Sequence, residues 1–504
     1  MGELQPERLL SPTDPAGPAV IAGDRTLSWD DVERRARCLA RALAESDVGV
    51  GQVWGVLARN RVEWAEISLG NGRAGTRVVP LNWHLTATEI AALLDDSGCR
   101  LVVVEPELRE VVDDAIAATG RPDAIAVVEL GADYESWLEA AGDELLTQRA
   151  SGSPLMFTGG TTGKSKGVTR ADLAGPVGAP IAAFAGWGSL VRMPDHGTTL
   201  ITTPLYHALG SAVLAASLAK GIPVVVAPRF DPLVTLELIE RHRITATPMV
   251  PTQFIRLLKL DDDQRSRFDL SSLEWILHTA APCPSWAKVA MIQWLGPVIY
   301  EMYGSSEGTG PAICDSTEWL AHPGTVGRAS GRVEYSIVDD DGNDLPPGEV
   351  GTIYCRRADG APEYYGDPEK TASIQLPDGR FTVGDLGWLD EDGYLYLADR
   401  RVDLMLIAGS NVYPAEVEAV LSEHPAVGDV AVFGIPDPEW GEQVKAVIEP
   451  VGDIDLDDVR RFAAERLAAY KLPKSYDLVD RLPREAHGKL KKRLLRDPYW
   501  ELQG

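Results

Sequence analysis

A short run of glycine, threonine and lysine constrains this chain more than any other feature. Residues 158–167 read Thr-Gly-Gly-Thr-Thr-Gly-Lys-Ser-Lys-Gly and directly follow the apolar segment 154–157. Glycine lets the backbone turn sharply and point its N–H groups at an anion, while hydroxyl and lysine side chains add further donors. The pattern predicts a strand that ends in a polyphosphate-binding loop. A P-loop is excluded, because that motif needs glycine at the position of Thr158.

The charge balance narrows the classes of partner. The 504 residues include 48 basic and 75 acidic side chains, for a net charge of −27. This disfavours binding to nucleic acid or to anionic lipid through a basic face, although a local site can still bind a small anion. The five cysteines are scattered without a CxxC pair, so we expect a reducing, cytoplasmic location. No leader-like start and no run of about 18 apolar residues is seen, so no membrane span is expected.

The order of the predicted elements indicates an α/β fold. Before residue 330, apolar strands such as 101–104 and 223–227 alternate with helices such as 32–43 and 87–95. Strands that alternate with helices favour a large domain with parallel-rich sheets. Ser28, followed three residues later by an aspartate, is a capping-box pattern that predicts a helix start.

The second part of the chain has more turn signals and a different order of predicted elements. Between about 330 and 400, Asp-Gly and Pro-Gly turns crowd together and predict a β-rich subdomain. Beyond it, a helix from Pro414, two strands and a helix at 457–470 predict a small α+β domain. We therefore expect a large N-terminal domain over 1–400, a small mobile C-terminal domain over 403–504, and a hinge near 400–403.

Motifs spread over nearly the whole chain resemble those of the adenylate-forming superfamily of acyl-CoA synthetases, luciferases and nonribosomal adenylation domains. The chain is closest in look to bacterial fatty-acyl or bulky-acid CoA ligases. The motifs follow the family's order: the loop 158–167, Pro204–His207 with Gly210, Tyr303–Glu307, Gly384–Asp385 with Gly393–Tyr394, Asp399–Glu418 and Pro483–Arg493.

The resemblance implies that the chain activates a carboxylic acid with ATP and Mg²⁺. Positive charge and hydrogen-bond donors are needed there, because two anions must meet in the transition state. Lys489, His207 and Glu307 would be catalytic, and Glu307 would also hold Mg²⁺, a cation that prefers oxygen ligands. The residues expected to bind the nucleotide are Thr158, Gly159, Gly160, Thr161, Thr162, Gly163, Lys166, Tyr303, Gly304, Ser306, Asp385 and Arg400. The segment 278–282 is similar to the family's Gly-Ala-Pro segment and is expected beside the nucleotide.

The resemblance also implies a second step, in which the small domain rotates and coenzyme A attacks the acyl-AMP. Gly409 would let the backbone approach the pantetheine in its tunnel, and Val402 and Asp403 would form the hinge. The chain departs from the family pattern at Ser165, where proline is usual, at Val402, where an aspartate or lysine is common, and at Ala408, where glycine is common. The departure at Ser165 concerns the adenylation step, whereas those at Val402 and Ala408 concern the thiol-transfer step.

His207 is expected to line the acyl pocket, and the other residues expected there are small: Ala208, Gly210, Ala280, Ala281 and Gly304. Small residues enlarge a pocket, and its walls should be apolar. We therefore predict a hydrophobic, bulky acid, either a polycyclic terpenoid or steroid-like carboxylate or a medium to long fatty acid, with an aryl acid as an alternative.

Two rival functions share most of these features. An acyl-AMP ligase would deliver its adenylate to a carrier protein or partner enzyme instead of to coenzyme A. A catalytically dead nucleotide-binding protein would keep the loop, but the presence of both Glu307 and Lys489 argues against it. The sequence leaves the acid and the oligomeric state open, with a homodimer among the alternatives.

Overall fold

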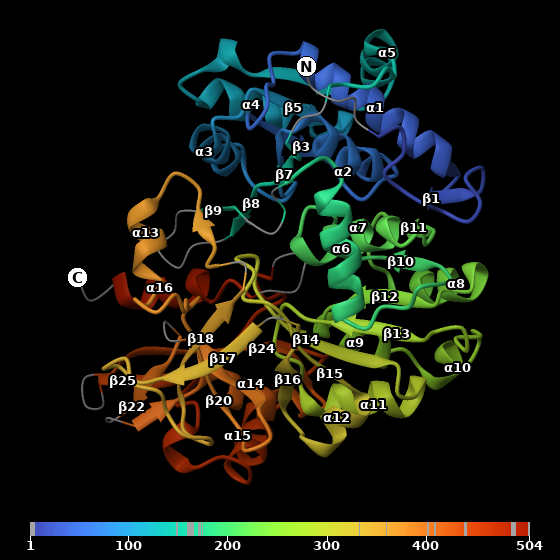
Figure 1. The fold of residues 1–504 in the computed structure, drawn as a ribbon. Helices are drawn as coiled ribbons and strands as arrows, with labels where there is room; N and C mark the ends of the chain where they lie inside the picture. The colour runs from blue at the N-terminus through green and yellow to red at the C-terminus, as the bar shows by residue number, and fades with distance from the viewer. Residues whose placement is uncertain are drawn as a thin grey trace.

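The computed structural model describes residues 6–147, 150–158, 166–169, 173, 175–331, 333–358, 360–400, 403–407, 410–437, 441–484 and 490–501. For Thr158, Asp399, Arg400, Ser410, Asn411, Gly441 and Glu501 it describes the backbone alone. The fold is α/β, with a large N-terminal domain and a smaller C-terminal one (Figure 1). No helix within these ranges combines the length and the apolar character needed to cross a bilayer.

The first part of the chain forms a parallel sheet in the order β6-β5-β3-β4-β7. Its strands are β3 (Val53–Leu57), β4 (Arg77–Pro80), β5 (Leu101–Val104), β6 (Ala126–Glu129) and β7 (Ser153–Pro154). The accompanying helices are α1 (Trp29–Glu45), α2 (Glu63–Ala74), α3 (Ala87–Ser97), α4 (Arg109–Ala118) and α5 (Ala132–Ala141). Ser28 and Asp31 form the predicted capping box of α1, and the predicted apolar face of that helix, Val32 to Leu43, is buried.

The large sheet continues from parallel into antiparallel strands. Its parallel part contains β1 (Pro18–Ala22), β10 (Thr199–Ile201), β11 (Val224–Val226), β12 (Ala246–Met249), β13 (Trp275–His278) and β14 (Ile299–Tyr303), with β2 (Arg25–Ser28) antiparallel at the edge. Its helices are α6 (Ala179–Leu190), α7 (Ala208–Ala219), α8 (Pro232–His242), α9 (Pro251–Leu258), α10 (Asp262–Arg265), α11 (Ser285–Leu295), α12 (Ser316–Ala321) and α13 (Pro368–Ser373). β11 and β13 are buried along their length, as expected for parallel strands covered on both faces.

The turn-rich segment after residue 330 forms antiparallel strands, and these extend the large sheet instead of making a sheet of their own. They are β17 (Val333–Val338), β18 (Gly351–Arg357), β20 (Asp385–Leu389) and β21 (Tyr394–Arg400). They join β14 through two antiparallel strands that precede residue 330, β16 (Thr325–Ala329) and β15 (Ala312–Asp315), in the order β17-β18-β20-β21-β16-β15-β14. A short third sheet joins β8 (Met156–Thr158), β9 (Lys166–Thr169) and β19 (Glu363–Tyr364). The predicted strand before the glycine-rich loop is therefore present as β8.

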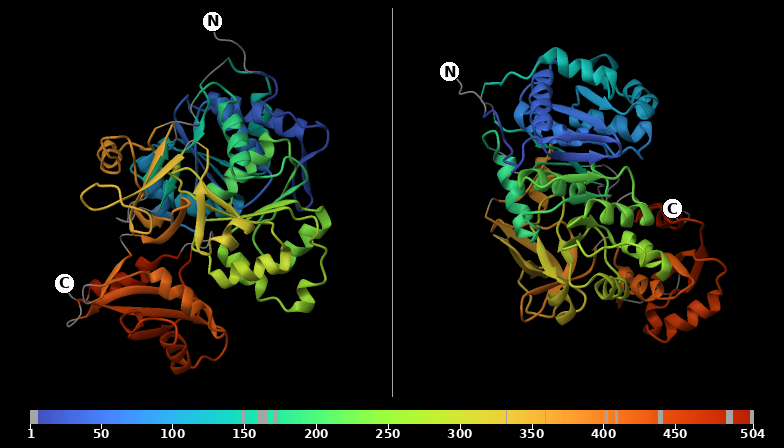
Figure 2. Two further views of the ribbon diagram at one scale, coloured as in Figure 1. Left: turned by 60° about the horizontal axis from the view of Figure 1, so that its bottom comes forward. Right: turned by 90° about the vertical axis from the view of Figure 1, so that its right-hand side faces the viewer.

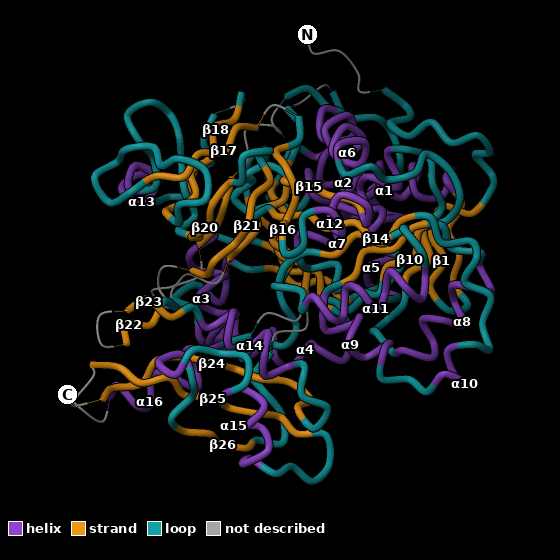
Figure 3. Tube along the Cα trace, turned by 90° about the horizontal axis from the view of Figure 1, so that it is seen from below, coloured by secondary structure: helices purple, strands orange, loops and turns teal. Residues whose placement is uncertain are grey.

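The C-terminal part has its own sheet and core. Its strands are β22 (Met405–Ile407), β23 (Ser410–Val412), β24 (Val427–Asp437), β25 (Gly441–Pro450) and β26 (Ser475–Leu478), with α14 (Pro414–Ser422), α15 (Leu456–Ala464) and α16 (Lys492–Glu501). Two further views show this sheet apart from the large one (Figures 2 and 3). The helix predicted over 457–470 is too long. It ends at Ala464, and the backbone is already extended at Ala468, before a 3₁₀ turn at Ala469–Lys471.

Candidate active site

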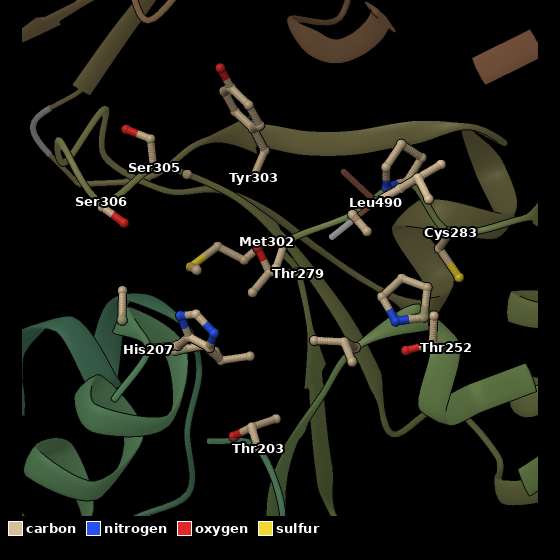
Figure 4. Close-up of a pocket in the computed structure, with 18 of the residues that line it drawn as sticks. Thr203, His207, Thr252, Thr279, Cys283, Met302, Tyr303, Ser305, Ser306 and Leu490 are labelled. Carbon is tan, nitrogen blue, oxygen red and sulfur yellow. The ribbon is translucent and has the colours of Figure 1, made fainter. Parts of the chain in front are cut away.

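The carboxyl ends of the parallel strands β10, β12, β13 and β14 meet at one edge of the large sheet. The loops that follow them line a cleft of about 2550 Å³, which we call the central cleft. Ligands of open α/β sheets bind outside this edge. The small domain lines the central cleft as well, through residues such as Glu418, Asp429 and Leu490. Figure 4 shows part of the cleft, with His207, Thr279, Tyr303 and Leu490 around one space.

A buried hydrogen bond joins two of the predicted nucleotide-binding residues. The hydroxyl of Tyr303, at the end of β14, donates to Oδ2 of Asp385, the first residue of β20, at 2.7 Å. Both residues line the central cleft, as do Gly304 and Ser306. An aromatic ring beside a carboxylate can stack on a base while the carboxylate accepts from ribose hydroxyls.

Glu307 lies beside a residue that sequence reasoning missed. The hydroxyl of Tyr364 is 3.4 Å from Oε1 of Glu307, and Nζ of Lys166 lies 5.6 Å from the centroid of the Tyr364 ring. Tyr364 reaches this position because β19 pairs with β9, the strand that follows the glycine-rich loop. Tyr364 thus lies between the predicted residues Lys166 and Glu307. Its position there is revealed only by the pairing of β19 with β9.

The loop that carries Ser306 and Glu307 is held by three side chains of the antiparallel strands. Arg357 donates to the carbonyl of Gly308 at 2.7 Å, Tyr335 to that of Gly310 at 2.6 Å, and Cys355 to that of Thr309 at 2.6 Å. Gly308 and Gly310 both have positive φ, a conformation that glycine adopts at little cost. Loop carbonyls fixed in this way keep the neighbouring polar side chains in place.

All six residues predicted for the acyl pocket line the central cleft: His207, Ala208, Gly210, Ala280, Ala281 and Gly304. Gly210 and Gly304 are small for different structural reasons. A Cβ at Gly210 would lie 2.5 Å from the carbonyl oxygen of Pro204, so glycine is needed there for close backbone approach. A Cβ at Gly304 would meet only the Gly310 carbonyl oxygen at 3.6 Å, so its small size serves the open space. Sequence reasoning did not single out several further lining residues, among them Thr203, Thr252, Cys283 and Met302.

His278 is the one residue of the segment 278–282 that does not line the cleft. It is fully buried at the end of β13 and does not line the central cleft, unlike the residues 279–282 that follow it. Burial lowers its pKa well below the usual value, and the nearby Lys288 ammonium acts in the same direction. Lys288 also pairs at 2.5 Å with Glu301, which lines the cleft. His278 is therefore a neutral core residue.

Two neighbours of His278 bear on the chemistry of the cleft. Ala280 has φ of 76°, a left-handed conformation that costs a non-glycine residue roughly 1 kcal/mol. Such strain gathers at functional sites. Burial raises the pKa of the Cys283 thiol, which keeps it protonated and unsuited to nucleophilic attack.

Several predicted residues lie outside the described ranges. These are Gly159, Gly160, Thr161, Thr162 and Gly163 of the loop, together with Val402, Gly409 and Lys489. For Thr158 and Arg400 only the strand positions in β8 and β21 are given. Asp403 lines the central cleft, and so do Arg484 and Leu490, which flank the segment with Lys489 and pair with each other.

The donor chemistry of the cleft fits magnesium bound together with a phosphate ligand. Glu307 offers a carboxylate, the kind of ligand that Mg²⁺ prefers. Among the residues that the structure describes, no three or more His, Cys, Asp or Glu side chains are grouped to hold a metal by themselves. A magnesium ion here would share its coordination sphere with phosphate oxygens and water, as is common for this ion.

The fold and the cleft define an α/β enzyme that handles a nucleotide between a large and a small domain. Residues 12–365 match the AMP-binding enzyme family, and residues 416–489 match the AMP-binding enzyme C-terminal domain. The chain belongs to this family of adenylate-forming acid–CoA ligases, whose members use ATP, Mg²⁺ and coenzyme A.

Similar proteins act on different acids. The chain is 32% identical to the fatty acid–acyl-carrier-protein ligase ScoC of Streptomyces coeruleorubidus, over 97% of this chain and 94% of ScoC. It is 33% identical to indoleacetate–CoA ligase of Aromatoleum aromaticum, over 95% and 94% of the two chains. Among solved structures, the amide bond synthetase McbA of Marinactinospora thermotolerans matches with a TM-score of 0.82 at 28% identity, covering 96% of each chain. Other relatives are ligases of long-chain fatty acids and of a fused-ring propanoyl acid.

Proposed function

We propose that this chain activates an apolar carboxylic acid as its acyl-AMP and then transfers the acyl group to the thiol of coenzyme A. One observation carries the proposal: the central cleft joins a polar end, with Tyr303, Asp385 and Glu307, to a wall made by α6 and α7. Neither helix contains a charged residue over its twelve positions. Such a wall suits a hydrophobic acid, either a polycyclic carboxylate or a fatty acid.

The first step forms a bond between a carboxylate oxygen of the acid and the α-phosphorus of ATP, and pyrophosphate leaves. In this proposal Ser306 and the loop 158–166 bind the phosphates, while Asp385 holds the ribose. Glu307 would hold Mg²⁺, which supplies positive charge for the phosphate oxygens when it is bound. Lys489 would bridge the acid and the α-phosphate. Leu490 lines the cleft near Thr279 and Tyr303, which supports this role for its neighbour.

In the second step the thiol sulfur bonds to the acyl carbon, the thiol proton is released and AMP leaves. His207, which immediately precedes α7 and lines the cleft, would position the acyl carbonyl. Gly409 would lie beside the pantetheine arm, and a turn about 400–403 would exchange the two faces of the small domain. The alternative acceptor is a carrier protein, which the likeness to a carrier-protein ligase favours to a small degree.

The test is a panel of acids with ATP and Mg²⁺, offered to coenzyme A or to a phosphopantetheinylated carrier protein. The panel runs from octanoate and hexadecanoate to a steroid-type carboxylate and an aryl acid. We expect pyrophosphate release with one apolar class and the matching acyl-CoA. Pyrophosphate release with free coenzyme A left unused, but with an acylated carrier protein, would establish the alternative. ATP binding without pyrophosphate release for any acid would refute both.

A further inference from the structure

A second cavity lies behind the wall of the central cleft. It has a volume of about 70 Å³, and we call it the rear chamber. Its walls come from α2, α6, α7 and the nearby strands, which lie side by side in Figure 1. Most of its lining side chains are apolar, among them Trp64, Ile181, Phe184, Leu205, Leu214 and Ala215, and four are polar: Ser68, Asn71, Ser151 and Ser211.

Three residues line both the rear chamber and the central cleft: Pro154, Phe184 and Ser211. Phe184, from the middle of α6, is the large one. The hydroxyl of Ser211 donates to the carbonyl of His207 at 3.0 Å, within its own helix, so its polar group is satisfied locally. The partition between the two spaces is therefore apolar on both sides, and the Phe184 ring is its bulkiest part.

The frame around the partition is fixed. α6 and α7 approach closely at Gly188, where a Cβ would lie 3.3 Å from the Cβ of Ala216. Trp64 is 4% exposed and its Nε1 donates to the carbonyl of Arg59 at 2.8 Å. Leu205 and Leu214 are buried as well. Because tightly packed walls relax only in part, removing the Phe184 ring should open a connection and not collapse the chamber.

We propose that Phe184 sets the upper limit on the length of a linear acid, and that the rear chamber binds the terminal methylenes of longer alkyl chains once this ring is removed. The inference rests on the proposed function. The chamber is about half the size of the roughly 150 Å³ apolar cavity that accepts benzene in another protein. With the space of the lost ring it holds a few methylenes, each worth about fourfold in binding.

The experiment measures kcat/KM of acid-dependent pyrophosphate release for even-numbered linear acids of about 6 to 18 carbons. For Phe184→Ala we expect the preferred acid to lengthen by about two to four carbons, with a gain of at least tenfold for the longer acid relative to octanoate. Phe184→Val removes less of the ring and should give a smaller shift of the same sign.

Two further variants separate the chamber from general loosening. Ala215→Leu fills the rear chamber, so in the Phe184→Ala background it should restore the original preference. Ile181→Ala enlarges the chamber with the partition intact and should leave the preference unchanged. An unshifted profile in both Phe184 variants, or a shift that Ala215→Leu does not reverse, would overturn the inference while the proposed function stands. No pyrophosphate release with any acid, in wild type or variants, would overturn the proposed function and this inference with it.

Discussion

The hydroxyl of Tyr303 joins two residues expected to bind the nucleotide. The Tyr303 ring is expected to stack on adenine, and the carboxylate of Asp385 to accept hydrogen bonds from the ribose hydroxyls. Replacing Tyr303 with phenylalanine keeps the ring and removes the 2.7 Å hydrogen bond to Asp385. A hydrogen bond to a charged group contributes about 1.5–3 kcal/mol, so we expect the KM for ATP to rise about tenfold with a smaller change in kcat. Steady-state kinetics check this prediction. Tyr300→Phe on the same strand is the control, since Tyr300 does not line the central cleft. Equal KM values for both variants would contradict the role of Tyr303.

For single residues, the sequence predicts which residues form the site better than it predicts which other residues contact them. The predicted site residues that the structure describes in full, such as Glu307, line one cleft. Tyr364, by contrast, stands in no recognisable motif, and its place beside Glu307 follows from the pairing of β19 with β9 across about 200 residues of sequence. The segment 278–282 was expected beside the nucleotide because it resembles a family motif; residues 279–282 line the cleft, and the His278 side chain is buried in the core.

Strands β13 and β14 and helix α11 enclose a buried group of polar side chains that ties stability to pH. His278 is neutral there, because burial and Lys288 lower its pKa. The facing carboxylate of Glu301, 3.7 Å from Nε2 of His278, is paired with Lys288. In the unfolded chain the pKa of histidine is about 6.5, so the unfolded state takes up a proton below that pH and the folded state does not. The part of the folding stability that depends on a neutral His278 is therefore fully present above about pH 6.5 and is lost as the pH falls below that value.

We expect His278→Gln, which cannot titrate, to lack this loss. Between pH 7 and pH 5 the free energy of unfolding of wild type should fall by about 2 kcal/mol more than that of the variant. Urea unfolding of both proteins at several pH values measures the difference, which cancels the titration of other groups. A gap between the two proteins that is the same at pH 5 and pH 7 would contradict a neutral His278.

Elements as such were largely predictable from the sequence. The strands 101–104 and 223–227 and the helices 32–43 and 87–95 were found because their apolar periodicity and caps are local signals. The end of α15 was missed: the helix stops at Ala464, and the backbone is extended at Ala468. Sheet membership was not predictable either: β17, β18, β20 and β21 join the large sheet through pairings distant in sequence.

The two domains touch around the mouth of the central cleft. Nζ of Lys259 on the large domain donates to the carbonyl of Gly428 at 3.2 Å, and Trp286 lies 3.5 Å from the hydroxyl of Ser422. In this arrangement Leu490, the neighbour of the residue proposed to act in adenylation, lines the central cleft. The rear chamber could not be predicted from the sequence. Its lining residues come from α2, α6 and α7, and each of them looks like an ordinary core residue in its own segment.

Lys489→Ala should separate the two half-reactions. Removing a charge that acts on the transition state of adenylation should lower acid-dependent pyrophosphate–ATP exchange by at least about 100-fold. Thioester formation from supplied acyl-AMP and coenzyme A should stay within a few-fold of wild type. Arg493→Ala, an exposed cation of the same segment, is the control. If both half-reactions fell equally in Lys489→Ala, the rotation of the small domain would be the wrong account.

The most direct test of the central claim is acid-dependent exchange of labelled pyrophosphate into ATP by the wild-type protein, with Glu307→Gln beside it. Labelled pyrophosphate enters ATP only if the acyl-AMP forms and then reacts back with pyrophosphate. We therefore expect exchange that requires both Mg²⁺ and an apolar acid and that falls by about 100-fold or more in Glu307→Gln. Exchange that is absent with every acid, while ATP still binds, would contradict the claim that this cleft activates carboxylates.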